Sequence, residues 1–447
     1  MVVNGIIAEY NPFHNGHQYH VERSRVETGA DYCVIVLSSN FTQRGEPAIV
    51  DKFTRARMAL ECGADLVLEL PIACSASSAE SFAQGGVSLL HQLGVVDHVC
   101  FGSECGDVGI LSKFAKILLE EPKSYVEDLR SGLAAGHSYP VARNRALMDY
   151  SPELAQYKDV LSSPNNILGI EYVKAILKYK SKLTPHTILR VGSNYHDRSF
   201  GSEYCSALAI REAIFSHGSS NKHVTLPDVF TEDGPLHNGS ASGLSTQISG
   251  SDFDASASLS RQMPKKAVQI LTASLRETPA MTIDDFSQML LYKLLIEKKE
   301  GYERYLDVTS ELSDRIRNSL GQFQSYSSFC DQLKRKNMTY TRISRSLLHV
   351  LLGMTKEDAF RNDTNSHLPY ARVLGFRKDA EPLLGEIKKS SSIPLVTKLA
   401  DAPQLLSPDA MDFLNRELQY GSIYESMAAL KAGRRARDER QIPIVIV

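Results

Sequence analysis

The first 105 residues alternate between continuous apolar runs and amphipathic segments, and no other feature constrains the fold as strongly. Apolar runs of strand length occupy residues 2–10, 32–39, 65–71 and 96–103, and the segments between them carry apolar residues at helical spacing. Strands that are apolar throughout are typical of parallel sheets with both faces covered by helices. The sequence therefore predicts an α/β fold with a doubly wound parallel sheet, whose ligands bind outside the carboxyl ends of the strands.

The remainder of the chain divides at a segment poor in large apolar residues. Residues 216–263 are rich in Ser, Gly, Asp and Asn, which indicates a flexible loop or linker. The patterns beyond it are helical. We therefore expect a sheet domain at 1–215, this linker, and a mainly α-helical C-terminal domain at 264–447.

Composition narrows the class of protein further. The 447 residues are 43% hydrophobic and 23% charged, which is ordinary for a globular chain with a large core. Seven cysteines form no CxxC pair and have no common zinc spacing, so we expect buried free thiols and no metal site. No secretory leader and no run of about 20 apolar residues is visible, so we expect a cytoplasmic protein without a membrane partner.

The most informative stretch is EYNPFHNGHQYH, from Glu9 to His20, between the first strand and the first helix. Exposed N–H groups and the dipole at a helix N-terminus attract phosphate. His14 and His17 are placed there to donate hydrogen bonds to charge that builds on a nucleotide during attack at its α-phosphorus. Gly16 keeps the backbone open to a base or ribose. The alternative is a pair of turn histidines with no catalytic role.

Other segments make this pattern far more specific. They resemble, over nearly the whole chain, the bacterial tRNA(Met) cytidine acetate ligases, a family within the HIGH nucleotidyltransferase superfamily. The insertion at 216–263 is longer than is usual in that family. The segments that carry the resemblance are GIIAEYNPFHNGHQYH, SSNFTQRGEPAIVDKFTRARMAL (38–60), FGSE (101–104), SSPNNILGIEYVKA (162–175), RVGSNYHD (190–197), SALAIR (206–211), YTRISRSLLHVLLG (340–353) and YARVLGF (370–376).

The resemblance implies an ATP-dependent ligase. Such enzymes activate acetate as acetyl-adenylate and transfer the acetyl group to the wobble cytidine of elongator tRNA(Met), giving N4-acetylcytidine. ATP is then a co-substrate, with Mg²⁺ expected from triphosphate chemistry. The resemblance places catalysis on His14 and His17. It places ATP contacts on Ile7, Ala8, Glu9, Tyr10, Asn11, Pro12, Phe13, His14, Asn15, Gly16, His17, Gln18, Tyr19, His20, Gly102, Asn165 and Arg190.

Residue types add hypotheses for several other positions. Gln43, Arg44 and Glu46 follow the second strand, at the rim where the site is expected. Lys52 and Arg55 share a helix face that serves either phosphate and tRNA or only solvent. We interpret a turn formed by Tyr195, His196 and Asp197 as a lid over the nucleotide.

A basic C-terminal part suits a polyanionic partner. Residues 265–447 contain 28 Lys and Arg against 23 Asp and Glu, although the whole chain has a net charge of −2. We expect Lys334, Arg335 and Lys336 to bind tRNA phosphates, because the apolar helix that follows holds them in place. A second group near the chain end is expected to fray. It comprises Lys431, Arg434, Arg435, Arg437 and Arg440. Arg342 and Arg345 are either RNA contacts or buried structural partners. For each of the basic clusters, the alternative is ordinary solvent-exposed surface with no RNA contact.

Two other functions remain open at this point. One is a small-substrate nucleotidyltransferase that makes a coenzyme or dinucleotide, and the other is a non-catalytic nucleotide- and RNA-binding protein. The basic helical C-terminal part argues against the first, and the intact HNGH turn argues against the second. The sequence does not fix the oligomeric state.

Overall fold

The structure is a computed structural model that describes residues 1–190, 206–218, 259–335, 338–359 and 367–447. The predicted linker at 216–263 lies largely outside these ranges. The turn formed by Tyr195, His196 and Asp197 lies wholly outside them.

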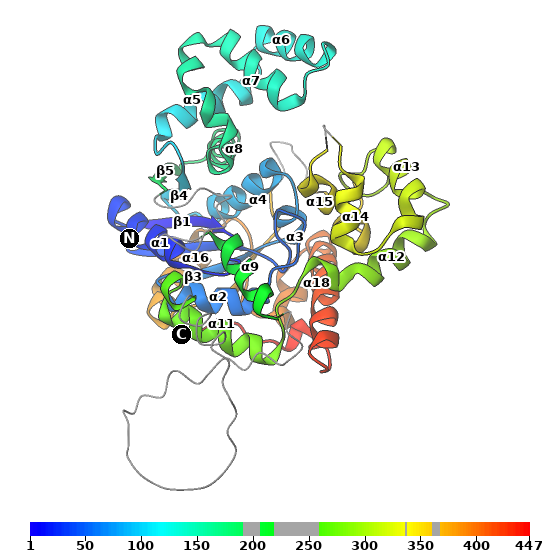
Figure 1. The fold of residues 1–447 in the computed structure, drawn as a ribbon. Coiled ribbons are helices and arrows are strands. Elements are labelled where there is room, and N and C mark those ends of the chain that lie inside the picture. The colour runs from blue at the N-terminus through cyan, green and yellow to red at the C-terminus, as the bar shows by residue number, and fades with distance from the viewer. Residues whose placement is uncertain (191–205, 219–258, 336–337, 360–366) are drawn as a thin grey trace, which may run out of the picture.

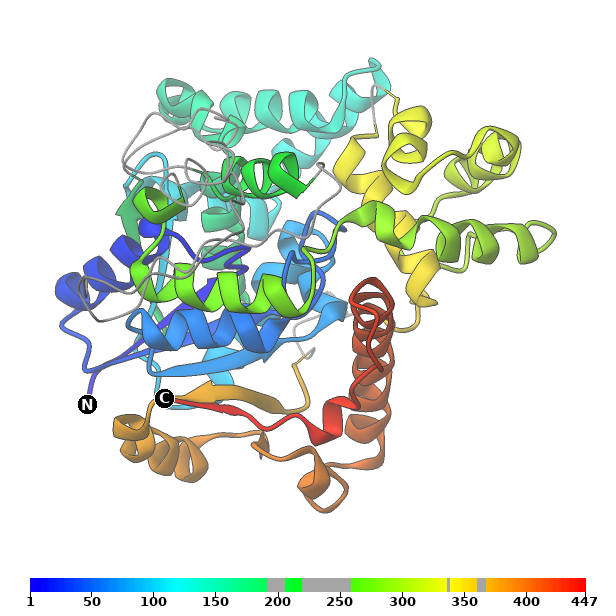
Figure 2. The ribbon, with the colours of Figure 1, turned by 60° about the horizontal axis from the view of Figure 1, so that its bottom comes forward.

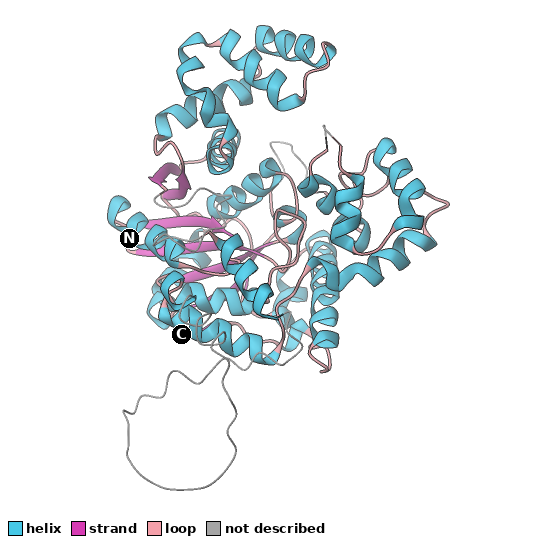
Figure 3. Ribbon diagram, viewed as in Figure 1, coloured by secondary structure: helices cyan, strands magenta, loops and turns pink. Residues whose placement is uncertain are grey.

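Five parallel strands form the centre of one sheet, which Figures 1 and 3 show in the middle of the molecule. Their order is β5-β4-β1-β2-β3, so the order reverses between β1 and β4. The predicted α/β fold with a doubly wound parallel sheet is confirmed for these strands. They are β1 (Val3–Ala8), β2 (Tyr32–Ser38), β3 (Leu66–Leu70), β4 (His98–Ser103) and β5 (Thr184–Leu189).

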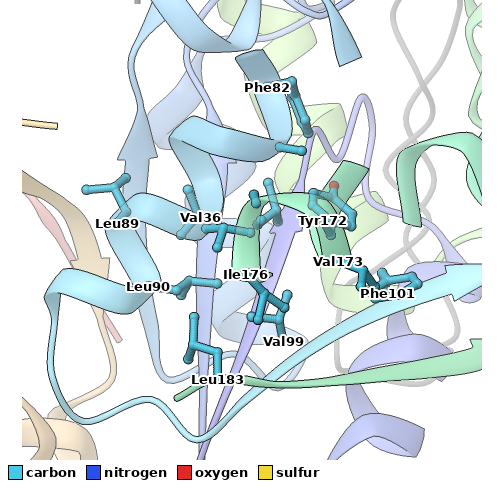
Figure 4. Close-up of a cluster of buried hydrophobic side chains, with 14 of the residues drawn as sticks. Val36, Phe82, Leu89, Leu90, Val99, Phe101, Tyr172, Val173, Ile176 and Leu183 are labelled. Carbon is cyan, nitrogen blue, oxygen red and sulfur yellow. The ribbon is translucent and has the colours of Figure 1, made fainter. Parts of the chain in front are cut away.

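Side chains along each strand alternate between two hydrophobic cores. Val36 of β2 belongs to the core in Figure 4, whereas its neighbours Ile35 and Leu37 belong to the core on the opposite face. Both faces are therefore buried, which is why these strands read as unbroken apolar runs. Helices α4 (Ala79–Gln92) and α8 (Pro164–Lys178) cover the first face, and α1 (Asn15–Thr28), α2 (Lys52–Glu61) and α11 (Lys265–Glu277) cover the second.

The C-terminal part differs from the expected helical domain because it adds three strands to the sheet. Strand β6 (Ala371–Phe376) pairs antiparallel with β3, which makes the sheet mixed. Both β7 (Leu395–Val396) and β8 (Val445–Ile446) pair parallel with β6. Figure 2 shows the red C-terminal segment beside β6. These strands are short and lie between long helices, so apolar periodicity in the sequence did not predict them.

Two helical lobes project from the sheet, one at the top and one at the right of Figure 1. The inserted lobe contains α5 (Val108–Glu120), α6 (Lys123–Ala134) and α7 (Tyr139–Tyr150). The tRNA-side lobe, named for the contribution expected of it, contains α12 (Ser287–Ile296), α13 (Ser310–Ser319), α14 (Tyr326–Leu333) and α15 (Tyr340–Leu352). The other helices are α3 (Ile72–Ser75), α9 (Ala207–Gly218), α16 (Glu381–Ser390), α17 (Ala402–Leu405) and α18 (Pro408–Lys431).

Two loops of the sheet domain tie the tRNA-side lobe in place. Ser344 Oγ donates a hydrogen bond of 2.9 Å to the carbonyl of Gly45, whose φ is +75°. A Cβ on Gly45 would overlap the main chain of Arg345, so only glycine allows this approach. The buried His349 ring lies between the carbonyls of Ala76 (2.9 Å) and Leu306 (3.0 Å). Among the described helices, none is long and apolar enough to cross a membrane.

Candidate active site

A cavity of about 250 Å³ lies at the carboxyl ends of β1 and β4, where the strand order reverses. Most of the residues expected to contact ATP line this cavity, including the two histidines expected to be catalytic. They are Ile7, Ala8, Glu9, Tyr10, Asn11, His14, Gly16, His17, Tyr19, His20, Gly102, Asn165 and Arg190.

Four residues of the expected ATP segment do not line the cavity. Phe13 is buried in the core beside Tyr10, with ring centroids 4.8 Å apart. Asn15 donates a hydrogen bond of 2.7 Å to the carbonyl of Arg261, and the Gln18 amide donates one of 2.8 Å to Glu22. Pro12 is the fourth. Along a helix only some positions of a continuous segment can face one ligand.

His14 and His17 cap the N-terminus of α1 with their own rings. His14 Nδ1 accepts a hydrogen bond of 3.1 Å from the Gly16 N–H, and His17 Nδ1 accepts one of 3.2 Å from the His14 N–H. The two rings stack with centroids 3.6 Å apart. Because each Nδ1 accepts, the neutral ring carries its proton on Nε2. Each imidazole therefore retains one donor for a ligand in the cavity.

All three histidines of the motif are neutral near pH 7. Burial lowers the pKa of His14 to about 3, and Arg190 and Arg211 lower it further in the same sense. Burial, followed by His14 and Arg190, holds the pKa of His17 well below its usual value. Burial, followed by Arg190, lowers the pKa of His20 to about 4. The site therefore offers phosphate neutral donors, with positive charge supplied by arginine.

Replacing His20 by glutamine should flatten the pH dependence of stability. As the pH falls, the unfolded chain takes up a proton near the ordinary imidazole pKa of 6.5, whereas folded His20 does so only near 4. The contribution of the neutral ring is therefore complete above pH 6.5 and is lost between about 6.5 and 4, at up to about 1.4 kcal/mol per pH unit. Urea unfolding at pH 7.5, 6 and 5 measures this slope, with pH 7.5 as the internal control. An unchanged slope would show that His20 has the same pKa in the folded and the unfolded protein.

On the β4 and β5 side, a reciprocal clamp holds Asn165 at the cavity. Glu104 accepts hydrogen bonds from the Asn165 side-chain amide (2.7 Å) and from the Asn166 N–H (2.9 Å). Asn166 Oδ1 in turn accepts from the N–H groups of Glu104 (2.9 Å) and Cys105 (3.0 Å). Glu104 thus satisfies N–H groups at the N-terminus of α8. Sequence reasoning missed Glu104 and Asn166, although both lie in the FGSE and PNN motifs.

Gly102 and Arg190 meet at the ends of β4 and β5. A Cβ on Gly102 would lie 3.2 Å from the Arg190 side chain, so the missing side chain leaves room for the guanidinium. Arg211 on α9 also lines the cavity and donates a hydrogen bond of 2.8 Å to the carbonyl of Asn11. The sequence analysis did not predict a role for Arg211, which is the last residue of the segment SALAIR.

On the β2 side, Thr42, Gln43 and Arg44 line the cavity, whereas Glu46 does not. The Gln43 N–H donates a hydrogen bond of 2.8 Å to Glu9 Oε1, which joins this loop to the end of β1.

Lys52 and Arg55 are buried, so this helix face is neither a tRNA or phosphate surface nor a solvated one. The Arg55 guanidinium binds the carbonyls of Glu9 (2.7 Å), Ser39 and Val50 (3.3 Å), which fixes the loops around the cavity. Lys52 belongs to a buried ion cluster with Glu69, Arg372 and Glu439. The helical spacing showed that Lys52 and Arg55 share a face but not that the C-terminal chain covers it.

The basic groups have different environments. Lys334 and Arg335 are exposed between α14 and α15, and Lys334 pairs with Asp331 at 3.3 Å; Lys336 lies outside the described residues. Arg345 pairs with Asp307 at 3.5 Å. The group near the chain end does not fray as expected, because Glu425 binds both Arg434 (2.6 Å) and Arg437 (3.2 Å) before the chain enters β8.

The comparisons with known proteins agree with this site. The sequence profile of the HIGH Nucleotidyl Transferase family matches residues 1–440. Together with the paired imidazoles at the start of α1, this defines a HIGH nucleotidyltransferase. The chain is 38% identical over 449 residues to the tRNA(Met) cytidine acetate ligase of Acetivibrio thermocellus, covering 100% of both. It is 35% identical to that of Halothermothrix orenii, covering 100% of this chain and 99% of the other. The chain belongs to the family of tRNA(Met) cytidine acetate ligases.

Solved structures give the same answer for the fold. Thermotoga maritima TmcAL bound with alpha-thio ATP matches with a TM-score of 0.84 at 29% identity, over 100% of each chain. The apo form of the same protein matches with a TM-score of 0.86, again over 100% of each chain.

Proposed function

We propose that this protein uses ATP to activate acetate and transfers the acetyl group to the wobble cytidine of elongator tRNA(Met), giving N4-acetylcytidine. The observation that carries the proposal is the pair of neutral imidazoles at the N-terminus of α1, inside a cavity at the reversal of strand order. The relatives named tRNA(Met) cytidine acetate ligase, matched over the full length, support the choice of substrates.

The reaction has two steps, and His14, His17 and Arg190 act in the first. A carboxylate oxygen of acetate bonds to the α-phosphorus, and the bond to the bridging oxygen breaks to release pyrophosphate. His14 and His17 donate hydrogen bonds through Nε2 to the phosphate oxygens as charge builds there, and Arg190 adds a positive fork. In the second step the cytidine N4 bonds to the acetyl carbon, the C–O bond to AMP breaks, and N4 loses one proton.

The remaining assignments follow from this chemistry. Mg²⁺ is the ion that triphosphate chemistry requires, and phosphate oxygens would hold it. Within the ranges that the structure describes, no group of three His, Cys, Asp or Glu side chains has metal-ligand geometry. We assign nucleotide chemistry to residues 1–215, a linker to 216–263 and a tRNA-binding contribution to 264–447, and we place the reaction in the cytoplasm.

The deciding experiment incubates an unmodified elongator tRNA(Met) transcript with the protein, ATP and acetate, followed by mass analysis of the nucleosides. Acetylated cytidine establishes both substrate and reaction. Acetate-dependent ATP–pyrophosphate exchange separates this proposal from a coenzyme-forming nucleotidyltransferase, which uses a phosphorylated acceptor. ATP binding without turnover would indicate a non-catalytic RNA-binding protein.

Neutralising Lys334, Arg335 and Lys336 together by glutamine should impair acetyl transfer and spare pyrophosphate exchange. Lys334 and Arg335 are exposed on the tRNA-side lobe, and neither of them lines the cavity where ATP and acetate are expected to react. Each phosphate contact that is lost should reduce the salt dependence of tRNA affinity by about one unit of slope. Titration of tRNA at several salt concentrations measures this. If affinity and slope are both unchanged, the cluster is ordinary surface.

A further inference from the structure

We propose that Glu9 and Gln43 together recognise the Watson–Crick edge of the acceptor cytosine, with Glu9 accepting hydrogen bonds from N4 and Gln43 donating to N3. The inference rests on the proposed function and names the residues that select the base. It concerns the β2 side of the cavity, opposite the side that holds Gly102, Asn165 and Arg190.

The sheet order separates the two sides of the cavity. Strands β4 and β5 lie on one side of β1, and on that side Gly102, Asn165 and Arg190 are expected to contact the nucleotide in addition to the segment after β1. Strand β2 lies on the other side of β1, and the loop after it brings Thr42, Gln43 and Arg44 to the cavity. His14 and His17 start the helix that follows β1, so they stand between the two sides. An acceptor that attacks the activated acetate therefore approaches from the β2 side.

Gln43 presents an unused donor on this side. Its side-chain nitrogen Nε2 is buried and has no hydrogen-bond partner among the residues that the structure describes, although Gln43 lines the cavity. Buried polar atoms in folded proteins nearly always have partners, so an unpaired amide in a cavity points to a ligand with an acceptor. The main chain of the loop is fixed by the bond from the Gln43 N–H to Glu9 and by the contact of Gly45 with α15.

Glu9 presents the matching acceptor. Its Oε1 receives the Gln43 N–H, and within the described part of the chain its Oε2 has no hydrogen bond. Arg55 holds the carbonyl of Glu9 at 2.7 Å, so the residue is anchored through both main chain and side chain. A carboxylate beside the Gln43 amide disfavours acetate or phosphate at this pair, because like charges repel at bonding distance. The pair is thus suited to a neutral ligand with a donor next to an acceptor.

Cytosine has this pattern, because its N4 amine donates and its N3 accepts. Uracil has an acceptor at O4 and a donor at N3, so O4 would meet the Glu9 carboxylate acceptor, and N3–H would require the Gln43 amide to turn over. A cavity of about 250 Å³ cannot hold a folded RNA, so the wobble base must leave its stack to enter. When N4 attacks, one of its hydrogens stays in the amide product. The other passes as a proton to Glu9 Oε2, while AMP leaves with the electron pair of the broken C–O bond.

The test uses Gln43→Met, which keeps the length of the side chain and removes the donor, and Gln43→Glu, which replaces the donor by an acceptor. Acetyl transfer to the cytidine-bearing transcript should fall about 10- to 100-fold in both, the cost of one good base contact. The KM values for ATP and acetate in pyrophosphate exchange should change by less than about threefold. Gln156→Met, at an exposed glutamine between α7 and α8, is the matched control.

A second measurement reports base selection directly. A transcript with uridine at the wobble position is titrated as an inhibitor of transfer, and its Ki is compared with the KM of the cytidine transcript. The wild type should prefer cytidine, and Gln43→Met should narrow that preference about tenfold. An unchanged preference overturns the inference, as does a KM for acetate that rises in step with the loss of transfer. If the wild type forms no acetylated cytidine, the proposed function itself has failed.

Discussion

Replacing His17 by alanine is expected to lower acetate-dependent pyrophosphate exchange by about 10²- to 10³-fold, the usual cost of one transition-state donor. The physical reason is the fixed tautomer. Because His17 Nδ1 accepts the His14 N–H, the proton resides on Nε2, and burial keeps the ring neutral. The rings of His14 and His17 are stacked, so the donor is already oriented before ATP binds. Exchange measured at saturating ATP and acetate gives the effect on the chemical step.

A second variant separates donation from helix capping. His17→Asn keeps an acceptor close to the position of Nδ1 and removes the Nε2 donor. If donation to phosphate is the role of His17, asparagine and alanine should be equally inactive, although asparagine should preserve the thermal stability better. Recovery of exchange in His17→Asn would instead reduce His17 to a capping residue.

The largest expected effect on stability is at Lys52. Its ammonium lies 2.5 Å from both Glu69 and Glu439, and Arg372 binds the same two carboxylates at 2.9 and 2.5 Å. Burial raises the pKa of Glu69, but Lys52 and Arg372 outweigh it and hold that pKa at about 2. Lys52→Met leaves two buried carboxylates with one cation, so we expect a loss of about 3–5 kcal/mol in the free energy of unfolding.

Urea unfolding measures this loss, and two further variants define its origin. Lys52→Met combined with Glu439→Gln removes the surplus charge and should recover part of the stability, because the effects of neighbouring residues are not additive. Lys266 pairs with Glu61 at the surface, where its side chain is 63% exposed, so Lys266→Met should cost less than about 1 kcal/mol. Equal losses at Lys52 and Lys266 would contradict a special role for the buried cluster.

The sequence predicted those elements that depend on residues close together in the chain. The strand around Ile35 and the helix that starts at the HNGH turn follow from apolar periodicity and from the chemistry of a helix N-terminus. The contacts that complete the site join distant segments. Arg211 reaches Asn11 from α9, and Glu439 reaches Lys52 from the last turn before β8. Periodicity carries no information about such pairs.

For Arg55, the sequence predicted the helix face correctly but not its burial. Its spacing from Lys52 correctly placed the two on one helix face, but a charged face is normally exposed. Only the tertiary structure shows that three carbonyls from two loops surround the guanidinium and that the C-terminal chain covers the lysine. The motifs FGSE and PNN predicted nucleotide contacts. Their reciprocal hydrogen bonds to each other, however, depend on the contact between the end of β4 and the start of α8, which the sequence does not show.

The contact between Gly45 and α15 limits how far the enzyme can change shape when the RNA binds. The tRNA-side lobe is tied to the sheet through main-chain atoms at Gly45 and through His349, so a swing of that lobe would break both ties. The loop that carries Gln43 is one of the tied segments and moves only with them. We therefore expect the lobe to move little when the RNA binds, so that most of the free-energy cost of adaptation falls on the anticodon loop. RNA sequence changes that stiffen or loosen that loop should then control how fast the wobble base reaches the cavity.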